Sequence, residues 1–524
     1  MATLNWIGKE KVINHHLDVP YRVLNHQYSF DEKGQDEEDK RYDNKVIRGD
    51  NLQALKALLP QYEGKVKCIY IDPPYNTGNE KWVYNDNVND PKIKKWLGEV
   101  VGKEGEDLSR HDKWLCMIYP RLKLLHKLLA EEGAIFISID DNEQAHLRLI
   151  CDEIFGYNNF INNVIWQKKY SPQNDARYFS DMHDFVMVYA KDKGLWDRNL
   201  LPRSAEQNKR YKNMDNDPRG PWKSSDLSVK TYSQDYDYPI ETPGGRIVNP
   251  PQGRCWRTSK ENFQKLVEDN RIWFGVKGNN VPSIKRFLSE VQDGIVPVTL
   301  WLREEVGDNQ EASQELKKIF PDSAFPFDTP KPPRLIERIL QIATDENSIV
   351  LDSFAGSGTT AHAVLNMNKE DGGNRKFILV EMEDYAENIT AERVKRVIKG
   401  YGDIEGTGGG FNFYELGEPL LIENQYINEK VPVNKIKEYV YFMETKEVLI
   451  NSENSYYLDT HNNTAYYFYY EGERITTLNY DFLETIKESA ENYIIYADIC
   501  TLSEEELLKY NITFKKIPRD IRRL

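Results

Sequence analysis

Residues 66–75 read Val66-Lys67-Cys68-Ile69-Tyr70-Ile71-Asp72-Pro73-Pro74-Tyr75. The apolar, β-branched run up to Ile71 predicts a buried strand. Proline cannot donate a hydrogen bond to a sheet, so the strand must end before Pro73. Open α/β sheets bind their ligands at such carboxyl ends of strands. We therefore expect Asp72, the proline carbonyls and the ring of Tyr75 to hold a flat molecule that bears an amine. The alternative is a rigid turn with a stacked tyrosine, because Asp-Pro turns are common.

A second strand followed by a turn lies far downstream. It reads Ser348-Ile349-Val350-Leu351-Asp352-Ser353-Phe354-Ala355-Gly356-Ser357-Gly358-Thr359-Thr360. We expect a strand, a glycine-rich turn, and a helix from about Thr359 to Asn366. Small residues let the backbone approach a ligand closely, and N–H groups at a helix start can bind it. The next strand, Lys376–Glu381, ends in an acid that suits two ribose hydroxyls. This half of the chain is therefore predicted to bind a nucleoside.

The glycine-rich turn is not that of a nucleoside triphosphatase. No Gly-Lys-Ser or Gly-Lys-Thr occurs anywhere in the chain. A P-loop needs that lysine and hydroxyl for the phosphates and their magnesium ion. Any cleavage powered by ATP would have to come from another polypeptide.

Strands and helices alternate around both turns. The pattern predicts a strand at 45–48, a helix at 52–59, a helix at 111–132, a strand at 134–139, a helix at 143–155, and strands at 163–167 and 185–190. Residues 76–106 are rich in Asn, Lys and Gly, and we expect a loop over the first turn. The order predicts an α/β fold, with a doubly wound, Rossmann-like sheet.

The chain has 524 residues, too many for one core, and its composition changes along its length. We expect a polar N-terminal arm (1–40), a first half of the catalytic domain (41–195), an inserted domain (196–310), a cofactor-binding half (311–400), and a small α+β C-terminal domain (401–524). The C-terminal part contains 12 Lys and Arg against 22 Asp and Glu. It therefore accounts for most of the net charge of −15, and a basic face elsewhere can still bind phosphate.

The inserted segment interleaves basic and aromatic residues. Examples are Lys209-Arg210-Tyr211-Lys212, Arg219-Gly220-Pro221-Trp222-Lys223, Arg254-Cys255-Trp256-Arg257 and Arg271-Ile272-Trp273-Phe274. Such a pattern suits a surface that pairs with phosphates and stacks on bases. It equally suits an irregular domain with aromatic residues in its core, and the residues alone leave both interpretations open.

Other features narrow the class of protein. The five cysteines are scattered, with no pair at zinc or redox spacing, so we expect buried free thiols and no metal site. No window resembles a membrane span and the first residues do not resemble a signal peptide, so we expect a cytoplasmic protein. His111 and His183 are expected to pack or to cap helices.

Taken together, the two turns resemble the motifs of amino-methylating DNA methyltransferases. The catalytic motif precedes the cofactor motif, with a long insert between them, as is typical of the beta class. Two further matches are Asp328-Thr329-Pro330-Lys331-Pro332 and His183-Asp184-Phe185-Val186-Met187-Val188-Tyr189-Ala190-Lys191. The chain is most similar to the modification subunit of type III restriction-modification systems, over about residues 40–195 and 295–400. It is short for such a subunit, which also fits an orphan or phage-borne enzyme.

The resemblance implies roles for the first turn. The carboxylate of Asp72 and the carbonyl of Pro73 would accept the two hydrogens of an exocyclic amine, and Tyr75 would stack on a base flipped out of the duplex. Pro74 completes the motif. Asp at its first position favours the N6 amine of adenine over the N4 amine of cytosine without excluding cytosine.

The resemblance also implies a site for S-adenosyl-L-methionine. Backbone around Phe354, Ala355 and Gly356 would hold its methionine part, Glu381 its ribose, and Asp50 its adenine amine. Thr329 and Lys331 would close the carboxylate end. The remaining expected cofactor residues are Asp72, Asp352, Ser357, Gly358 and Thr359. A surface acid and a surface lysine are the plainer interpretations of Asp50 and Lys331.

The implied partners follow from the same resemblance. They are double-stranded DNA, a second copy of the chain in a homodimer, and a separate restriction subunit that is a helicase and nuclease. The inserted domain would recognise the target sequence. The alternative function is a DNA-recognition component that methylates little or not at all.

Overall fold

The computed structural model describes residues 3–77, 91–101, 109–204, 208–291, 294–323, 326–422, 426–449, 456–472, 474–518 and 520–521. They form two compact units, one of residues 200–297 and one of the flanking chain on both sides. The loop expected at 76–106 lies mostly outside the described residues. Within it, Pro91–Val100 form helix α4.

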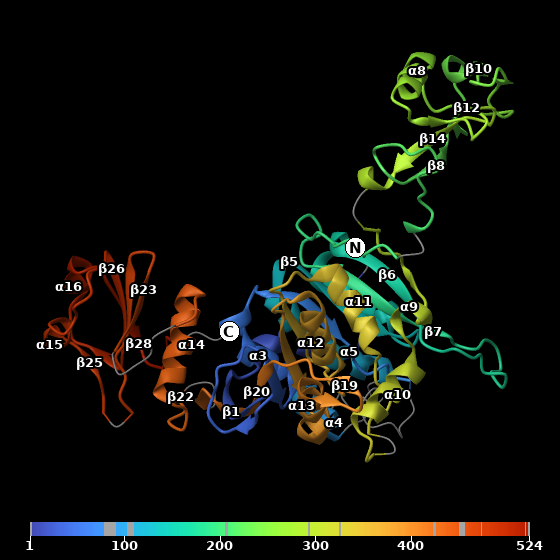
Figure 1. The fold of residues 1–524 in the computed structure, drawn as a ribbon. Helices are drawn as coiled ribbons and strands as arrows, with labels where there is room; N and C mark the ends of the chain where they lie inside the picture. The colour runs from blue at the N-terminus through green and yellow to red at the C-terminus, as the bar shows by residue number, and fades with distance from the viewer. Residues whose placement is uncertain are drawn as a thin grey trace. The chain divides into compact units, whose positions relative to one another are not determined.

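The larger unit is built on a mixed sheet (Figure 1). In spatial order its described strands are β15 (Leu300–Trp301), β6 (Phe160–Gln167), β7 (His183–Ala190), β5 (Leu129–Ile139), β4 (Val66–Ile71), β16 (Ile349–Asp352), β17 (Lys376–Glu381), β3 (Lys45–Arg48), β20 (Gly410–Pro419), β1 (Arg22–Asp31) and β2 (Gly34–Asp36). The strands from β5 to β20 in this order are parallel. The doubly wound α/β fold predicted from the sequence is confirmed.

The two motif strands are neighbours in the middle of this sheet. β4 and β16 pair in parallel, with Cys68 opposite Val350 and Ile69 opposite Leu351. From β4 the chain crosses to β5 on one side, and from β16 it crosses to β17 on the other. The strand order therefore reverses between β4 and β16. A crevice opens at the carboxyl ends of two strands that diverge in this way.

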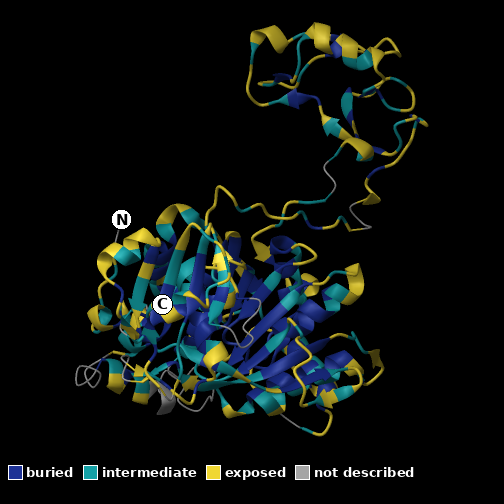
Figure 2. Ribbon diagram, turned by 90° about the vertical axis from the view of Figure 1, so that its left-hand side faces the viewer, coloured by how far each residue is buried: buried dark blue, intermediate teal, exposed yellow. Residues whose placement is uncertain are grey.

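The crossover helices form two groups. α3 (Asn51–Tyr62) and α5 (Arg110–Leu128) pack together, and α12 (Thr359–Asp371) packs against both α11 (Pro333–Ala343) and α13 (Glu392–Lys399). Because parallel crossovers are right-handed, helices that connect strands in opposite directions cover opposite faces of the sheet. The buried residues concentrate in the sheet and the helix faces toward it (Figure 2).

Helix starts follow local sequence signals. The Asp50 side chain accepts from the Gln53 N–H (3.0 Å) at the start of α3. Ser109 and Asp112 form a capping box at the start of α5, so His111 is not its cap. Pro333 occupies the first turn of α11, where its missing N–H costs nothing. Among the helices of the described residues, none is both long and apolar enough to span a membrane.

Residues 1–40 are not simply a polar arm. Residues 22–31 form β1, which pairs antiparallel with β20 at the far side of the sheet. Val23, Tyr28 and Phe30 are buried, Asn25 and Gln27 are exposed, and the buried Ser29 hydroxyl donates to Asn412 on β20 (2.7 Å). The charge run that follows obscured this pairing, which joins segments almost 400 residues apart. Strand β20 pairs with β1 and β3, so it belongs to the main sheet, although its residues were expected in the C-terminal domain.

The C-terminal part contains a smaller sheet in the order β23 (Tyr457–His461), β24 (Thr464–Phe468), β26 (Asn492–Ala497) and β28 (Ile512–Lys516). Helix α14 (Val433–Thr445) shares buried residues with the main core, and α16 spans Glu504–Lys509. The short helix α15 spans Tyr480–Leu483. Asn479 caps its start, and the chain leaves the helix after one turn.

The smaller unit, residues 200–297, is narrower than the insert expected at 196–310. Residues 298–319 return to the larger unit, where β15 pairs with β6 and α10 (Asn309–Ile319) packs against α13. The small unit holds a three-stranded sheet of β13 (Ile272–Trp273), β14 (Ser283–Phe287) and β8 (Trp222–Asp226), with helix α8 (Lys260–Glu268).

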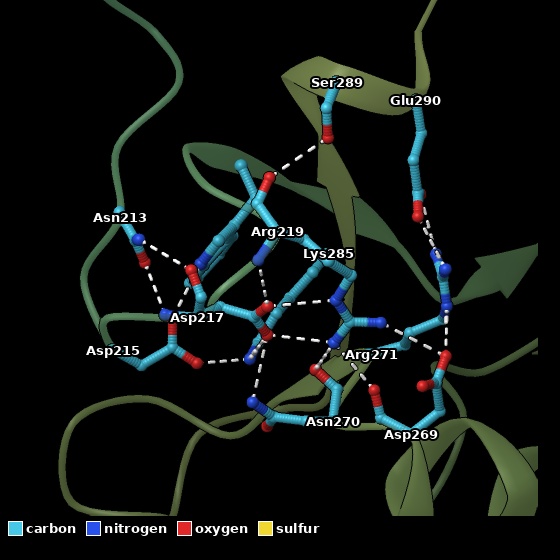
Figure 3. Close-up of polar contacts among 11 residues, drawn as sticks. Asn213, Asp215, Asp217, Arg219, Asp269, Asn270, Arg271, Lys285, Ser289 and Glu290 are labelled. Carbon is cyan, nitrogen blue, oxygen red and sulfur yellow. Dashed lines mark hydrogen bonds and ion pairs between the residues drawn. The ribbon is translucent and has the colours of Figure 1, made fainter.

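A buried ion network stabilises the small unit (Figure 3). The ammonium of Lys285 pairs with Asp215 and lies 3.6 Å from Asp217. Arg219 contacts the Asp217 carboxylate at 2.9 Å, and this guanidinium is the main reason that the pKa of Asp217 is lowered. Arg271 is paired with Glu290 (2.6 Å). Several cations of the basic and aromatic segments are therefore engaged within the unit.

The aromatic members of those segments are mostly in the core of the small unit. Trp222 is 0% exposed, Trp256 1% and Phe274 8%. Buried rings cannot stack on bases, so at these positions the core interpretation is confirmed. Lys209, Arg210, Lys212 and Lys223 are exposed and remain candidates for phosphate contacts.

Candidate active site

A cavity lies at the carboxyl ends of β4 and β16. The space in it that a water molecule can enter is about 20 Å³. The lining residues are Tyr70, Asp72, Phe327, Thr329, Pro330, Lys331, Asp352, Phe354, Ala355, Gly356, Ser357, Thr359 and Thr360. The end of the Asp-Pro-Pro-Tyr strand and the glycine-rich turn thus share one cavity, although 280 residues separate Asp72 from Asp352.

Asp72 and Lys331 form a buried ion pair in this cavity. Their side chains are 11% and 7% exposed, and the Lys331 ammonium contacts the Asp72 carboxylate. The same ammonium lies 5.2 Å from the centre of the Tyr75 ring. Burial raises the pKa of Tyr75 well above its usual value, with a further contribution from Asp72, so the phenol stays neutral. Lys331 is therefore not a surface lysine, and it contacts the first motif directly.

Helix α5 is hydrogen-bonded to the Asp-Pro-Pro-Tyr turn and to the residue that follows it. Trp114, fully buried, donates its indole N–H to the carbonyl of Pro74 at 2.6 Å. Asn76, also fully buried, donates to the Arg110 carbonyl (3.3 Å) at the start of the same helix. Asn76 has φ +59°, a left-handed conformation that asparagine tolerates better than most residues. Trp114 and Asn76 were not predicted as site residues, because only their contacts reveal this role.

Asp352 organises the start of the glycine-rich turn. Its carboxylate accepts from the Phe354 N–H (3.0 Å) and from the Thr360 hydroxyl (2.6 Å). The pKa of Asp352 is raised to about 7, chiefly by burial and in part by the nearby Asp72 carboxylate, while the hydrogen bonds from Thr360 and Phe354 and the Lys331 charge oppose the rise. Asp352 therefore fixes the start of the turn and lines the cavity with a carboxyl group that titrates near neutral pH.

Glu381 connects β17 to the turn. Its carboxylate accepts from the N–H of Gly356 (2.8 Å) and of Glu383 (3.0 Å), and the side chain is fully buried. A Cβ at Gly358, which has φ +83°, would lie 2.9 Å from the Thr390 carbonyl oxygen. A glycine at position 358 is therefore needed for the close packing of this turn.

Arg393 supports the turn from the other side. Its guanidinium is 1% exposed and donates to the hydroxyls of Ser357 (2.8 Å) and Thr359 (2.7 Å). Burial lowers the pKa of Arg393 to about 10. Ser357 and Thr359 line the cavity, yet their hydroxyls contact this arginine, and Thr359 also contacts the Lys331 carbonyl (3.2 Å). No sequence pattern around Arg393 indicated this role.

Of two further predicted residues, Thr329 lines the cavity and Asp50 is not among the lining residues. Thr329 has φ +49°, a strained conformation for a β-branched residue. Asp50 caps α3 and lies 3.5 Å from Arg121, so it does serve as a helix cap. The Gly49 N–H nevertheless donates to the Glu381 carbonyl at 2.9 Å, so Asp50 stands beside the end of β17.

A doubly wound sheet with a cavity at its point of strand reversal is typical of enzymes that bind nucleotide-like molecules. Residues 66–392 match the family model described as DNA methylase, N6_N4_Mtase. The match covers more than half of the chain and includes both turns. The chain belongs to this family of DNA methylases.

Several curated proteins are similar to the chain. It is 37% identical over 416 residues to the Type III restriction-modification enzyme StyLTI Mod subunit of Salmonella typhimurium, covering 73% of this chain and 61% of that protein. It is 31% identical over 477 residues to the EcoP15I Mod subunit of Escherichia coli, covering 79% and 71%. It is 32% identical over 365 residues to the Type II methyltransferase M.KpnI of Klebsiella pneumoniae, covering 64% of this chain and 80% of that protein. The chain thus spans about three fifths of the StyLTI subunit.

Proposed function

We propose that this chain transfers a methyl group from S-adenosyl-L-methionine to the N6 amine of an adenine flipped out of duplex DNA. The observation that carries the proposal is the shared cavity, in which Asp72 at the end of β4 meets the glycine-rich turn after β16. The family match and the relatives named as modification subunits and methyltransferases support it. Cytosine N4 is the alternative target, because an acidic first position in the motif does not exclude it.

The residues of the first turn would act on the amine through hydrogen bonds. The Pro74 carbonyl already accepts the indole N–H of Trp114. We therefore propose that the Pro73 carbonyl and the Asp72 carboxylate accept the two amine hydrogens. Accepting both hydrogens lets the nitrogen pyramidalise and frees its lone pair for attack. The Asp72 carboxylate then stabilises the positive charge that develops on nitrogen. When the base enters, part of the contact between Lys331 and Asp72 must break, because the same carboxylate then accepts the amine hydrogen.

The cavity fits the cofactor in its chemistry. The glycine-rich turn has no room for a side chain at Gly358, and it brings backbone close to the cavity. Phe354, Ala355 and Gly356 would hold the methionine part, Thr329 and Lys331 its carboxylate, and Glu381 and Asp50 the ribose and adenine at the adjoining strand ends. When bound, the sulfonium supplies an electrophilic methyl group.

The test is incorporation of labelled methyl groups into duplex DNA. We expect Asp72→Ala to lower the rate by about 100- to 1000-fold, because it removes one preorganised acceptor, while cofactor binding by calorimetry is largely kept. Asp140→Ala is the matched control, since Asp140 follows the neighbouring strand β5 and contacts only Asn142 in its own turn. Its rate should remain at the wild-type value.

Removing Asp72 also leaves the Lys331 charge without this buried partner, which can destabilise the protein. The double variant Asp72→Ala/Lys331→Ala removes both charges, and comparing its unfolding midpoint with that of Asp72→Ala shows how much stability the unpaired charge costs. Equal incorporation by wild type and Asp72→Ala would contradict the catalytic role. If wild type itself methylates no DNA yet binds it, the chain is a recognition component.

We propose that the chain acts as the modification subunit of a restriction-modification system, as a homodimer and beside a separate restriction subunit. The names of the relatives support this context, and residues 200–297 would recognise the target sequence. Sedimentation of the purified chain should give twice the mass of 61.3 kDa. A monomer at all concentrations would contradict the dimer.

A further inference from the structure

Three side chains behind the Asp-Pro-Pro-Tyr turn form a compact cluster. His111 lies in the first turn of α5, and Glu143 and His146 lie at the start of α6 (Gln144–Cys151). The Nδ1 atom of His111 is 2.6 Å from Glu143 Oε1, and that of His146 is 2.8 Å from Oε2. One potential ligand atom from each residue lies within 4.8 Å of the other two. The cluster brings together positions 35 residues apart.

The burial of Glu143 requires a compensating positive charge. Its side chain is fully buried, and within the described residues its ion pairs are those with His111 and His146. An uncompensated buried carboxylate is costly, so either a protonated imidazole or a bound cation has to supply positive charge beside it. A cation between the three side chains would do so and would also use a nitrogen of each imidazole as a ligand.

We propose that His111, Glu143 and His146 bind one divalent transition-metal ion, with Zn²⁺ as the best match to two imidazoles and one carboxylate. Metal–ligand bonds of about 2.0–2.2 Å in tetrahedral geometry place neighbouring ligand atoms roughly 3.3–3.6 Å apart. The observed 2.6 and 2.8 Å separations would have to widen by about 0.5–1 Å, which small rotations of the partly exposed histidine side chains can provide. The histidine side chains are 40% and 33% exposed, so solvent provides the entry path.

Asn76 contacts the same cluster. Its amide nitrogen donates to the Glu143 carboxylate and to the Arg110 carbonyl (3.3 Å), so this side chain links the catalytic turn to the three residues.

The site would be structural and close to the catalytic turn. Asn76 directly follows Tyr75, and Trp114, one turn after His111 on α5, holds Pro74. A metal ion would therefore fasten the start of α5, the start of α6 and the turn to one another. The proposed metal site is independent of the proposed methyl transfer, because metal binding can be measured without DNA or cofactor.

The experiment is metal titration of the full-length chain after treatment with a chelator and removal of the chelator. We expect one equivalent of Zn²⁺ to bind by equilibrium dialysis, and Co²⁺ to give the visible absorption of a low-coordinate site. Zn²⁺ at about 100 times its dissociation constant should raise the thermal unfolding midpoint by about 2–3 °C. His146→Ala and the isosteric Glu143→Gln should lose both effects, and His461→Ala, at a half-buried histidine of the C-terminal sheet, should keep them.

Circular dichroism of the metal-free proteins shows whether the variants fold. Two results would overturn the proposal. One is a wild-type chain that binds no stoichiometric Zn²⁺ or Co²⁺. The other is a folded His111→Ala/His146→Ala variant that binds the metal as tightly as wild type, which would place the ion elsewhere.

Discussion

At the scale of single residues, burial rather than residue type decides how the acids of the site behave. Asp72 and Asp352 end neighbouring strands. Asp72 has the Lys331 ammonium as its partner, whereas Asp352 is hydrogen-bonded by Phe354 and Thr360, which carry no charge. Burial therefore raises the pKa of Asp352 to about 7. One acid is available as a charged acceptor, and the other is a structural group that prefers its proton.

This difference predicts a pH dependence of stability. The pKa of Asp352 is higher in the folded state (about 7) than its ordinary value of 3.8, so the folded state binds the proton more tightly. Its contribution to stability is greatest at low pH, falls as pH rises through this range, and is constant above about 7. Asp352→Asn cannot ionise. Between about pH 5 and pH 8 the wild type should lose about 2–3 kcal/mol relative to this variant.

The measurement is urea unfolding of both proteins at the two pH values. Comparing the variant with wild type removes the contribution of the other buried acids, because these are common to both chains. The same pH dependence in the two proteins would show that Asp352 is not the group responsible.

At the scale of elements, helix α5 positions the catalytic turn. Trp114 donates to Pro74, and His111 and Arg110 lie at the helix start, where Asn76 and Glu143 make their contacts. The turn itself contains two prolines, which fix its φ angles but donate no hydrogen bonds. Its position therefore depends on donors from α5.

We expect Trp114→Phe to lower methyl transfer by about 10- to 100-fold, because a small shift of the turn moves the amine acceptors. Leaving the Pro74 carbonyl unsatisfied should also cost about 1–3 kcal/mol of stability. Trp166→Phe is the matched control. Trp166 is equally buried and donates to Gly307 at 2.9 Å, and neither residue is among those that line the cavity. Methylation rates and unfolding midpoints of the two variants separate the effects, and equal loss of rate in both would contradict a positioning role for Trp114.

At the scale of the whole molecule, the chain divides into a unit that carries the cavity and a unit of residues 200–297. The ends of the small unit are adjacent, since Leu201 and Ile295 exchange two backbone hydrogen bonds of 2.9 and 2.8 Å. Each unit has its own buried core. The small unit can therefore be removed and replaced by a short glycine linker.

We expect the chain without residues 200–297 to bind the cofactor as tightly as the full chain by calorimetry. It should lose methylation of specific sites at least 100-fold, because the remaining unit would contact phosphates without reading bases. Sequencing of methylated bases after expression checks this. If the shortened chain still modifies the same sites, recognition lies in the larger unit.

The sequence alone predicted the two strand-and-turn segments, the helix after Gly358 and the doubly wound sheet. These features follow from patterns that span a few neighbouring residues: apolar runs, prolines that end a strand, and glycines that allow a tight turn. The same local signals predicted the Asp72 and Gly356 ends of the cavity. They did not predict β1, whose partner strand β20 lies almost 400 residues away.

Only the tertiary structure decided which side chains meet. The contacts of Lys331 with Asp72, of Trp114 with Pro74, of Arg393 with Ser357, and of His111 with Glu143 join residues 32 to 259 positions apart. Such contacts depend on how crossover helices pack on the sheet and on which strands become neighbours. Local periodicity carries no information about that choice, because it is set by burial of the whole core at once.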